Sequence, residues 1–264
     1  MGYFLGIDIG SAFSKAVLSA DGTIKTYAIM PSGGNYKETA RAVAEESLKK
    51  ALLSFDDTSH TVATGYGSAA VDFSDETVTD ISCQARAIHR LFPQVRTVID
   101  VGGQFSKVIK INENGAATNF ILNEKCAAGS GKFLQVVSRL LHIEISDIGP
   151  LSLKAQKPVE FNTGCAVFAE SEAVSRVAEG ALVEDILAGV HKAMASKIAN
   201  LVERTGSPGV CAVTGGGAKD IGLVKAMEKE LGVALFVPGE PQITAAYGAA
   251  LLAGQKCCAG RINA

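Results

Sequence analysis

A nine-residue segment near the start of the chain recurs in its middle. Residues 7–15 read IDIGSAFSK and residues 99–107 read IDVGGQFSK, so six of the nine aligned positions are identical. Each copy lies between strand-like runs, which predicts a strand, a tight turn and a returning strand. Because a repeated supersecondary unit is the mark of a duplicated architecture, we expect two similar lobes.

The segments around the two copies predict a mixed α/β fold. An antiparallel meander of three strands is expected first, then a helix from about Lys37 to Leu53. We expect a first lobe over residues 1–95, to which the C-terminal helix can return, and a second over residues 96–264. Later elements are expected at Phe133 to Leu141, Ala166 to Glu179, Asp185 to Val202, Val210 to Thr214 (a strand), Ile221 to Leu231 and Thr244 to Ala253.

The composition favours a globular protein and gives no basis for nucleic-acid binding. Of the 264 residues 47% are hydrophobic, and the formal net charge of -2 comes without a clustered basic segment. No charged and apolar leader precedes the first predicted strand, and no apolar stretch reaches the roughly 18 residues of a membrane span. We therefore expect a cytoplasmic protein that binds neither nucleic acid nor a membrane.

The repeated turns carry the residues that a polyphosphate site requires. Backbone amides of a small-residue turn can receive an anion, and an aspartate at a strand end can hold Mg²⁺ through its water shell. We expect Asp8 and Asp100 to organise the metal and Gln104 to orient an attacking water. The expected nucleotide contacts are Gly10, Ser11, Gly102 and Gly103 to phosphates, and Gly215, Gly216 and Gly217 close to the nucleoside.

Other interpretations of these segments stay open. A single Asp-x-Gly turn more often does no more than end a strand. A nucleotide site is favoured because three clusters occur together, the two Asp-x-Gly turns and the glycines at 215–217. Lys15 and Lys107 are either phosphate contacts or solvated hairpin lysines. The segment Gly129-Ser130-Gly131-Lys132 lacks the glycine spacing of a P-loop before its lysine, so we exclude that motif.

Further segments carry a resemblance to a known family. The duplicated turns resemble those of the acetate and sugar kinase/heat-shock-70/actin superfamily. NEKCAAGSG at 123–131 and CAVFAESE at 165–172 resemble signature segments of the 2-hydroxyacyl-CoA dehydratase activators and of the benzoyl-CoA reductase ATPase subunits. The similarity continues at 63–67, 214–216 and 240–242 and covers essentially the whole chain. It implies ribonuclease-H-like lobes with an interlobe ATP cleft, and Gln242 as a nucleotide contact.

The same resemblance implies an iron–sulfur cluster. A cube takes about four thiolates, and neither Cys126 nor Cys165 has a neighbour at ferredoxin-type spacing. The resemblance implies a homodimer in which Cys126 and Cys165 of both copies hold one [4Fe-4S] cluster on the two-fold axis. A lone cysteine is more often a small buried hydrophobe, but the flanking segments reverse that expectation for these two. Both are expected to open helices.

The resemblance also implies an activity. A member reduced by a ferredoxin or flavodoxin would hydrolyse ATP and pass a low-potential electron to a 2-hydroxyacyl-CoA dehydratase, a related CoA-ester reductase or a double-cubane enzyme. One position departs from the family, because Phe105 stands where an acidic residue usually follows Gly-Gly-Gln, which puts metal handling or the hydrolysis rate in question. The alternatives are a small-molecule kinase of the same fold without a cluster, and a nucleotide-gated scaffold.

The remaining cysteines and the histidines are expected to be structural or incidental. The histidines are dispersed and show no metal-ligand spacing. They are Cys83 and Cys211, expected in buried runs, Cys257 and Cys258, expected near a frayed end, and His60, His89, His142 and His191.

Overall fold

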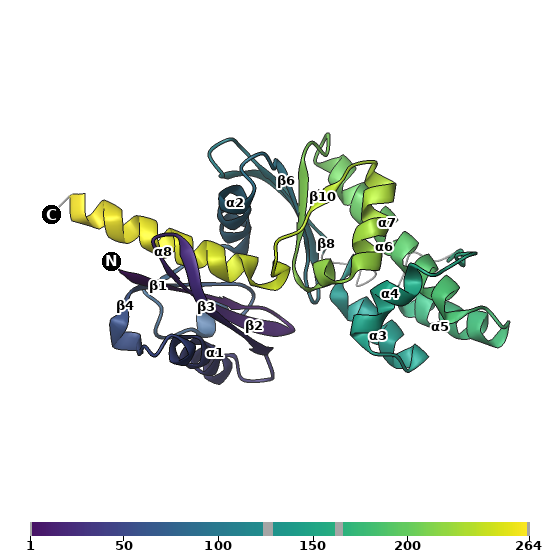
Figure 1. The fold of residues 1–264 in the computed structure, drawn as a ribbon, viewed down its shortest axis with the longest axis horizontal. Helices are drawn as coiled ribbons and strands as arrows, with labels where there is room; N and C mark the ends of the chain where they lie inside the picture. Colours follow the sequence, from purple (N-terminus) through teal and green to yellow (C-terminus); the bar gives the residue numbers. More distant parts are fainter. Residues whose placement is uncertain (1, 124–128, 162–165, 263–264) are drawn as a thin grey trace. The chain divides into compact units, whose positions relative to one another are not determined.

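The computed structural model describes residues 2–123, 129–161 and 166–262. Contacts between Cα atoms divide the chain into two units (Figure 1). Unit 1 comprises Met1–Gln94, Ile111–Thr118 and Gln242–Ala264, and unit 2 comprises Val95–Lys110 and Asn119–Pro241. Each unit contains one five-stranded sheet. In the described ranges, no helix has both the length and the apolar composition to cross a membrane.

Unit 1 has a mixed sheet of order β3-β2-β1-β4-β5. Strands β1 to β3 form the expected antiparallel meander, while β4 pairs in parallel with β1 and β5 in parallel with β4. The bounds are β1 Tyr3–Ile9, β2 Phe13–Ala20, β3 Thr23–Pro31, β4 Thr58–Thr64, β5 Glu76–Thr77, α1 Tyr36–Lys50, α2 Asp80–Leu91 and α8 Thr244–Ile262.

Helices cover both faces of this first sheet. Alternate residues of β1, including Leu5 and Ile7, are fully buried against the apolar side of α1. On the other face α8 lies along the sheet beside α2 (Figure 1). The approach is close, since a Cβ on Gly6 would lie 2.0 Å from the carbonyl oxygen of Ala246. The last helix of the chain therefore completes the core of the first unit.

Unit 2 has a sheet of order β10-β9-β6-β7-β8, in which β6 and β7 are antiparallel while β9 runs parallel to β6 and β10 parallel to β9. Helices α6 and α7 lie side by side (Figure 1) and bury their apolar sides in one core with β6 and β9. The bounds are β6 Thr97–Val101, β7 Ser106–Ile111, β8 Ala117–Asn123, β9 Cys211–Thr214, β10 Leu235–Phe236, α3 Gly131–Leu141, α4 Ile148–Ser152, α5 Ala166–Ala178, α6 Val183–Arg204 and α7 Ile221–Leu231.

The structure departs from the expected elements at a few places. Helix α1 ends at Lys50 because Leu52 adopts a left-handed backbone with φ 58°. Helix α8 continues to Ile262 rather than ending near Ala253, so Cys257 lies within a helix and not in a frayed end. Strand β8 has no fully buried residue, and a strand without an alternating buried face leaves no hydrophobic period to detect.

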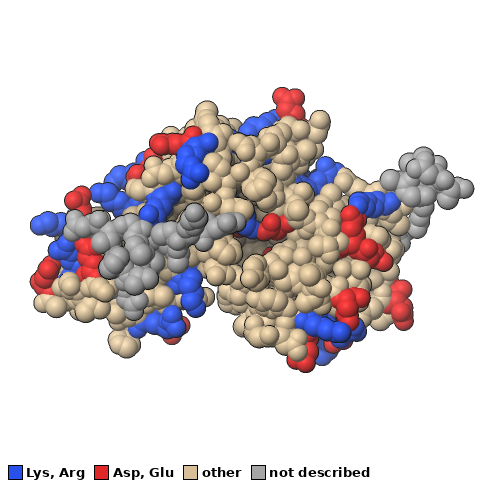
Figure 2. Space-filling model, turned by 180° about the vertical axis from the view of Figure 1, so that it is seen from behind, with Lys and Arg blue, Asp and Glu red and all other residues tan. Residues whose placement is uncertain are grey.

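Charged side chains of both signs are spread over the surface. On the face shown in Figure 2, lysine and arginine side chains are interspersed with aspartate and glutamate side chains. Several form ion pairs, such as Lys192 with Glu160 at 3.1 Å and Lys219 with Glu240 at 3.0 Å. Pairs this exposed add little to stability, about 1 kcal/mol or less each.

Candidate functional site

In unit 1 the carboxylate of Asp8 lies near the end of β1 among close partners. Hairpin pairing places Lys15 of β2 opposite Asp8, and Lys15 Nζ donates to Asp8 Oδ2 at 2.9 Å. The second oxygen faces Gly65, whose φ is 90° and where a Cβ would lie 2.3 Å from Asp8 Oδ1. Glycine is thus required at 65 by both backbone conformation and space. Asp8 is only 6% exposed.

Unit 2 repeats this arrangement around Asp100, which is also 6% exposed. Lys107 of β7 stands opposite, with Nζ 3.6 Å from Asp100 Oδ2. Gly215 has φ 81°, and a Cβ there would lie 2.5 Å from Asp100 Oδ1. The hydroxyl of Thr214 donates to the same oxygen at 3.4 Å. The third glycine cluster is therefore packed directly against the second aspartate.

The duplication extends beyond the nine residues that reveal it. The segment Thr64-Gly65-Tyr66-Gly67 follows β4 as Thr214-Gly215-Gly216-Gly217 follows β9, and the two have the same sequence of buried, half-buried and exposed residues. Sequence reasoning missed Thr64, Gly65 and Gly67 as site residues of unit 1. A search for a second Thr-Gly-x-Gly at a strand end would have found them.

The two Asp-x-Gly turns, which follow Asp8 and Asp100, are each closed by an equivalent backbone hydrogen bond. The amide of Gly10 donates to the carbonyl of Phe13 at 3.1 Å, and that of Gly102 to the carbonyl of Phe105 at 3.0 Å. These bonds use two of the four amides that were expected to donate to phosphates, those of Gly10 and Gly102. A phosphate at either turn would therefore have to accept from the amides that follow, beginning with Ser11 in unit 1 and Gly103 in unit 2.

The other predicted nucleotide residues lie on the same segments. Ser11 and Gly103 are half-buried in the turns, and Gln104 is exposed at the tip of the second. The glycine cluster runs into a 3-10 turn, Gly216–Lys219. The amide of Gly215 donates to the carbonyl of Pro241 at 2.9 Å, directly before Gln242. Within unit 2 the structure thus brings the second turn, the glycine cluster and the segment leading to Gln242 together.

A buried thiol lies close to the Asp8 arrangement. Burial, together with the negative charges of Asp8 and Glu76, raises the pKa of Cys83 to about 12. Cys83 is fully buried, as expected, and so is Cys211 of β9. Burial also raises the pKa of the Cys211 thiol. Both cysteines are therefore packing residues with protonated thiols.

The predicted cluster ligands, Cys126 and Cys165, lie outside the described residues. Helix α5 begins directly after Cys165, whereas α3 begins only at Gly131. Over the part of the chain that the structure describes, no group of three or more histidine, cysteine and acidic side chains is arranged to hold a metal ion.

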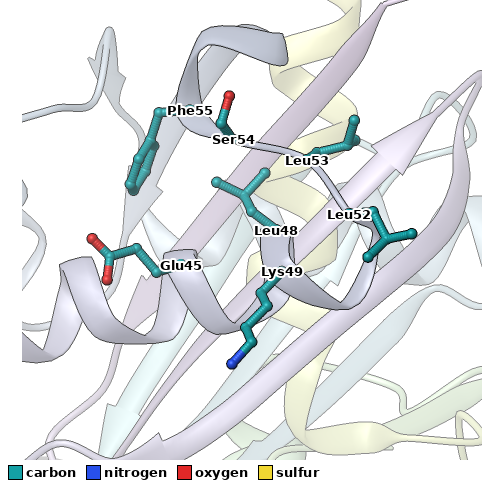
Figure 3. A pocket seen from close by; sticks show the side chains of 7 residues that line it. All are labelled: Glu45, Leu48, Lys49, Leu52, Leu53, Ser54 and Phe55. Atoms are coloured by element: carbon teal, nitrogen blue, oxygen red, sulfur yellow. The ribbon is translucent and has the colours of Figure 1, made fainter.

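A pocket of about 360 Å³ opens at the C-terminal end of α1 and contains none of the predicted site residues (Figure 3). Leu52, which is 93% exposed, stands at its edge. The lining is mostly apolar and comprises Glu45, Leu48, Lys49, Leu52, Leu53, Ser54 and Phe55. This surface is separate from the residues predicted to contact phosphates.

Comparison with known proteins identifies the family. The model of the BadF/BadG/BcrA/BcrD ATPase family matches residues 5–253. The chain belongs to this family. The matched range includes both Asp-x-Gly turns and the segments 64–67 and 214–217.

Relatives of the family are similar over nearly the whole chain. The (R)-2-hydroxyglutaryl-CoA dehydratase activating ATPase of Acidaminococcus fermentans is 40% identical over 256 residues, which is 96% of this chain and 98% of that protein. The structure of the activator of the 2-hydroxyisocaproyl-CoA dehydratase from Clostridium difficile, solved with bound ADPNP, is 37% identical with a TM-score of 0.95, covering 99% of this chain and 98% of that one.

More distant structures share only the fold. A ROK family glucokinase from Streptomyces griseus has a TM-score of 0.58 at 14% identity, covering 96% of this chain and 100% of that one. Together with the activator structures, this confirms the expected duplicated architecture of the actin, heat-shock-70 and sugar-kinase superfamily.

Proposed function

We propose that this chain is an ATP-dependent activator that delivers a low-potential electron to a 2-hydroxyacyl-CoA dehydratase or a related CoA-ester reductase or double-cubane enzyme. One observation carries the proposal: an aspartate held between a lysine and a glycine occurs twice, in a chain that aligns over 96% of its length with a dehydratase activating ATPase. A ferredoxin or flavodoxin is the proposed electron donor.

The two turns are the proposed phosphate site. The exposed or half-buried amides after Gly10 and Gly102, with Lys15, supply donors and positive charge for the phosphates. Gly216, exposed at the end of β9, and Gln242 are the proposed contacts to the nucleoside. The activator from Clostridium difficile was solved with bound ADPNP, which supports nucleotide binding by this chain.

A magnesium ion fits the donor set of this site. Mg²⁺ prefers carboxylate and phosphate oxygens and keeps several of its waters, so it needs only one or two protein ligands. Asp8 and Asp100 are carboxylates already stabilised by lysines, and we propose that they hold the ion through its waters. Gln104, exposed at the tip of the second turn, is the proposed group that orients the attacking water.

A [4Fe-4S] cluster shared by two copies is the proposed redox group. Each chain offers Cys126 and Cys165, so two copies are needed for about four thiolates. When bound, the cluster would supply the electron that the partner enzyme receives. Since α5 begins directly after Cys165, its N-terminal amides would stabilise negative charge nearby.

The first test is the iron and acid-labile sulfide content of anaerobically purified protein. We expect about four of each per dimer. Cys126→Ser should lose the cluster and electron transfer but bind ADP like the wild type by calorimetry. Cys257→Ser, which removes a thiol in α8, is the matched control and should keep both properties.

Two results would contradict parts of this proposal. Protein that stays free of iron after cluster reconstitution, yet dimerises and hydrolyses ATP, would exclude the electron donor and favour the kinase or scaffold. Loss of ADP binding in Cys126→Ser, with folding intact by circular dichroism, would mean that the cysteine and nucleotide sites are not separate.

A further inference from the structure

Backbone hydrogen bonds join the N-terminus of α3 to the second Asp-x-Gly turn. The amide of Gly131 donates to the carbonyl of Gly102 at 2.9 Å, and the amide of Lys132 to the carbonyl of Gly103 at 2.8 Å. The N-cap residue, Ser130, makes no side-chain cap hydrogen bond. The first amides of a helix have no partner within it, and here the carbonyls of the turn take that role.

A third bond ties the same two segments together. The hydroxyl of Ser106, at the start of β7, donates to the carbonyl of Gly129. Ser106 is 1% exposed, so this bond is shielded from water and costly to break. The segment 129–132, which follows Cys126 by three residues, is therefore attached to the turn at three points.

Unit 1 uses the equivalent groups differently. Ser14 corresponds to Ser106, and its hydroxyl lies 2.9 Å from that of Ser32. The hydroxyl of Ser32 in turn donates to the carbonyl of Gly10, the counterpart of Gly102, at 2.6 Å. In the first copy the turn is thus tied to a loop after β3, whereas in the second it is tied to a helix.

The peptide group explains why these bonds matter for a nucleotide. The carbonyl of Gly102 and the amide of Gly103 belong to one planar peptide unit, and the bond is trans. The two groups therefore point in opposite directions. A phosphate that accepts from the Gly103 amide pulls on the same rigid unit whose carbonyl holds Gly131, and hydrogen bonds in such chains polarise one another.

We propose that the peptide units between Gly102 and Gln104 form a relay through which a nucleotide at the second turn sets the position of the N-terminus of α3, with Ser106 as its positioning residue. The inference rests on the proposed function, because it requires nucleotide phosphates at this turn. It connects them to the segment that leads back to Cys126.

Hydrogen–deuterium exchange of the whole protein tests the relay. In the wild type, ADP with Mg²⁺ should slow exchange in peptides covering residues 132–137 by about threefold or more, because the N-terminal turn of α3 is held more firmly. Ser106→Ala should still bind ADP, with a Kd raised by no more than the lost coupling, about threefold, and should lose at least about half of that response. Ser14→Ala, the equivalent change in unit 1, should respond like the wild type.

A second variant keeps the test decisive if Ser106→Ala does not fold. Gly131→Pro removes the amide that donates to Gly102, and proline is tolerated at the first position of a helix. The preceding Ser130 is already extended, with φ -121° and ψ 163°, as a residue before proline prefers. The proline ring Cδ takes the place of the amide hydrogen that points at the Gly102 carbonyl, so the bond cannot form and the variant should lose the response. Its Kd for ADP is measured alongside, because the displaced carbonyl shares its peptide unit with the Gly103 amide.

The outcomes separate this inference from the proposed function. Wild-type protein that binds no ADP would overturn the proposed function and the relay with it. Wild-type protein that binds ADP without a change in exchange at 132–137 would overturn the relay alone. If Ser106→Ala and Gly131→Pro both keep the full exchange response to ADP, the relay alone would again be overturned.

Discussion

At the scale of single residues, each of the two buried aspartates has a lysine opposite it in its hairpin. A buried carboxylate without a partner costs several kcal/mol, about 3–5 when one member of a pair is removed. The hairpin register places Lys15 opposite Asp8 and Lys107 opposite Asp100, which supplies that partner in both copies. The spacing of aspartate and lysine in the repeat is therefore a structural requirement.

Cys83 allows a prediction about pH. Its pKa is raised to about 12, chiefly by burial, from an ordinary value of 9.0. A thiol whose pKa is higher in the folded state than in the unfolded state contributes stability that is fully present below the pKa of the unfolded state. That contribution is lost as the pH rises through the pKa of the folded state. The free-energy difference between wild type and Cys83→Ala, about 1 kcal/mol in favour of the wild type at pH 7.5, should shrink between pH 9 and 12.

Urea titrations at several pH values measure this difference. Cys257→Ala, which removes the half-exposed thiol of α8, is the control for effects of high pH on the rest of the protein. A difference between wild type and Cys83→Ala that stays constant from pH 7.5 to 11 would mean that the thiol is not shielded as the structure indicates.

At the scale of elements, three helices of unit 2 meet at a buried histidine. His191 of α6 lies with Nδ1 3.0 Å from Ser152 Oγ of α4 and with Nε2 3.0 Å from Asp220 Oδ2. Asp220 also caps α7, because its Oδ1 accepts from the amide of Leu223 at 3.0 Å. A serine, a histidine and an aspartate together suggest a hydrolase, but His191 is 1% exposed and cannot meet a substrate.

We expect His191→Ala to lower the free energy of unfolding by about 3 kcal/mol, because it leaves the buried Asp220 carboxylate with one partner fewer. His142→Asn is the matched control, since His142 is exposed with a left-handed backbone that asparagine tolerates. It should change stability by less than about 0.5 kcal/mol. Urea unfolding followed by circular dichroism measures both, and equal stability of the two variants would contradict a structural role for this histidine.

At the scale of the whole molecule, the chain returns at its end to the unit where it began. Helix α8 packs its small residues against β1, β4 and α2, and a Cβ on Gly248 would lie 1.8 Å from the carbonyl of Cys83. Small residues on both sides allow this close approach. The first 94 residues are therefore not a complete folding unit without the last helix.

Removal of α8 should affect the two units unequally. In a chain that ends at Pro241, we expect residues 1–94 to be cut by a nonspecific protease at least about tenfold faster than in the full chain, because one face of the first sheet is uncovered. Unit 2 keeps its own core and should stay resistant. Mass spectrometry of the fragments locates the cuts.

A chain that ends at Lys256 keeps Ala245, Ala246, Tyr247, Ala249, Ala250 and Ala253, the buried apolar residues in the described part of α8. It serves as the control and should resist like the full chain. Equal resistance of residues 1–94 in both shortened chains would mean that the first sheet does not depend on α8.

The sequence alone determined what depends on neighbours in the chain. Turn chemistry and alternating hydrophobicity predict both hairpins, and helical periodicity predicts α7 as observed at Ile221–Leu231. The repeat also identifies Asp8 and Asp100, because their register with the lysines is set by short turns. The resemblance to the dehydratase activators follows from contiguous segments of the same kind.

Only the tertiary structure decided which distant residues meet. The contact of Gly65 with Asp8, the bonds from the second turn to α3, and the meeting of His191 with Ser152 and Asp220 all join segments far apart in the chain. Local propensities carry no record of these contacts, because their energies come from packing and buried hydrogen bonds that exist only after both sheets have formed.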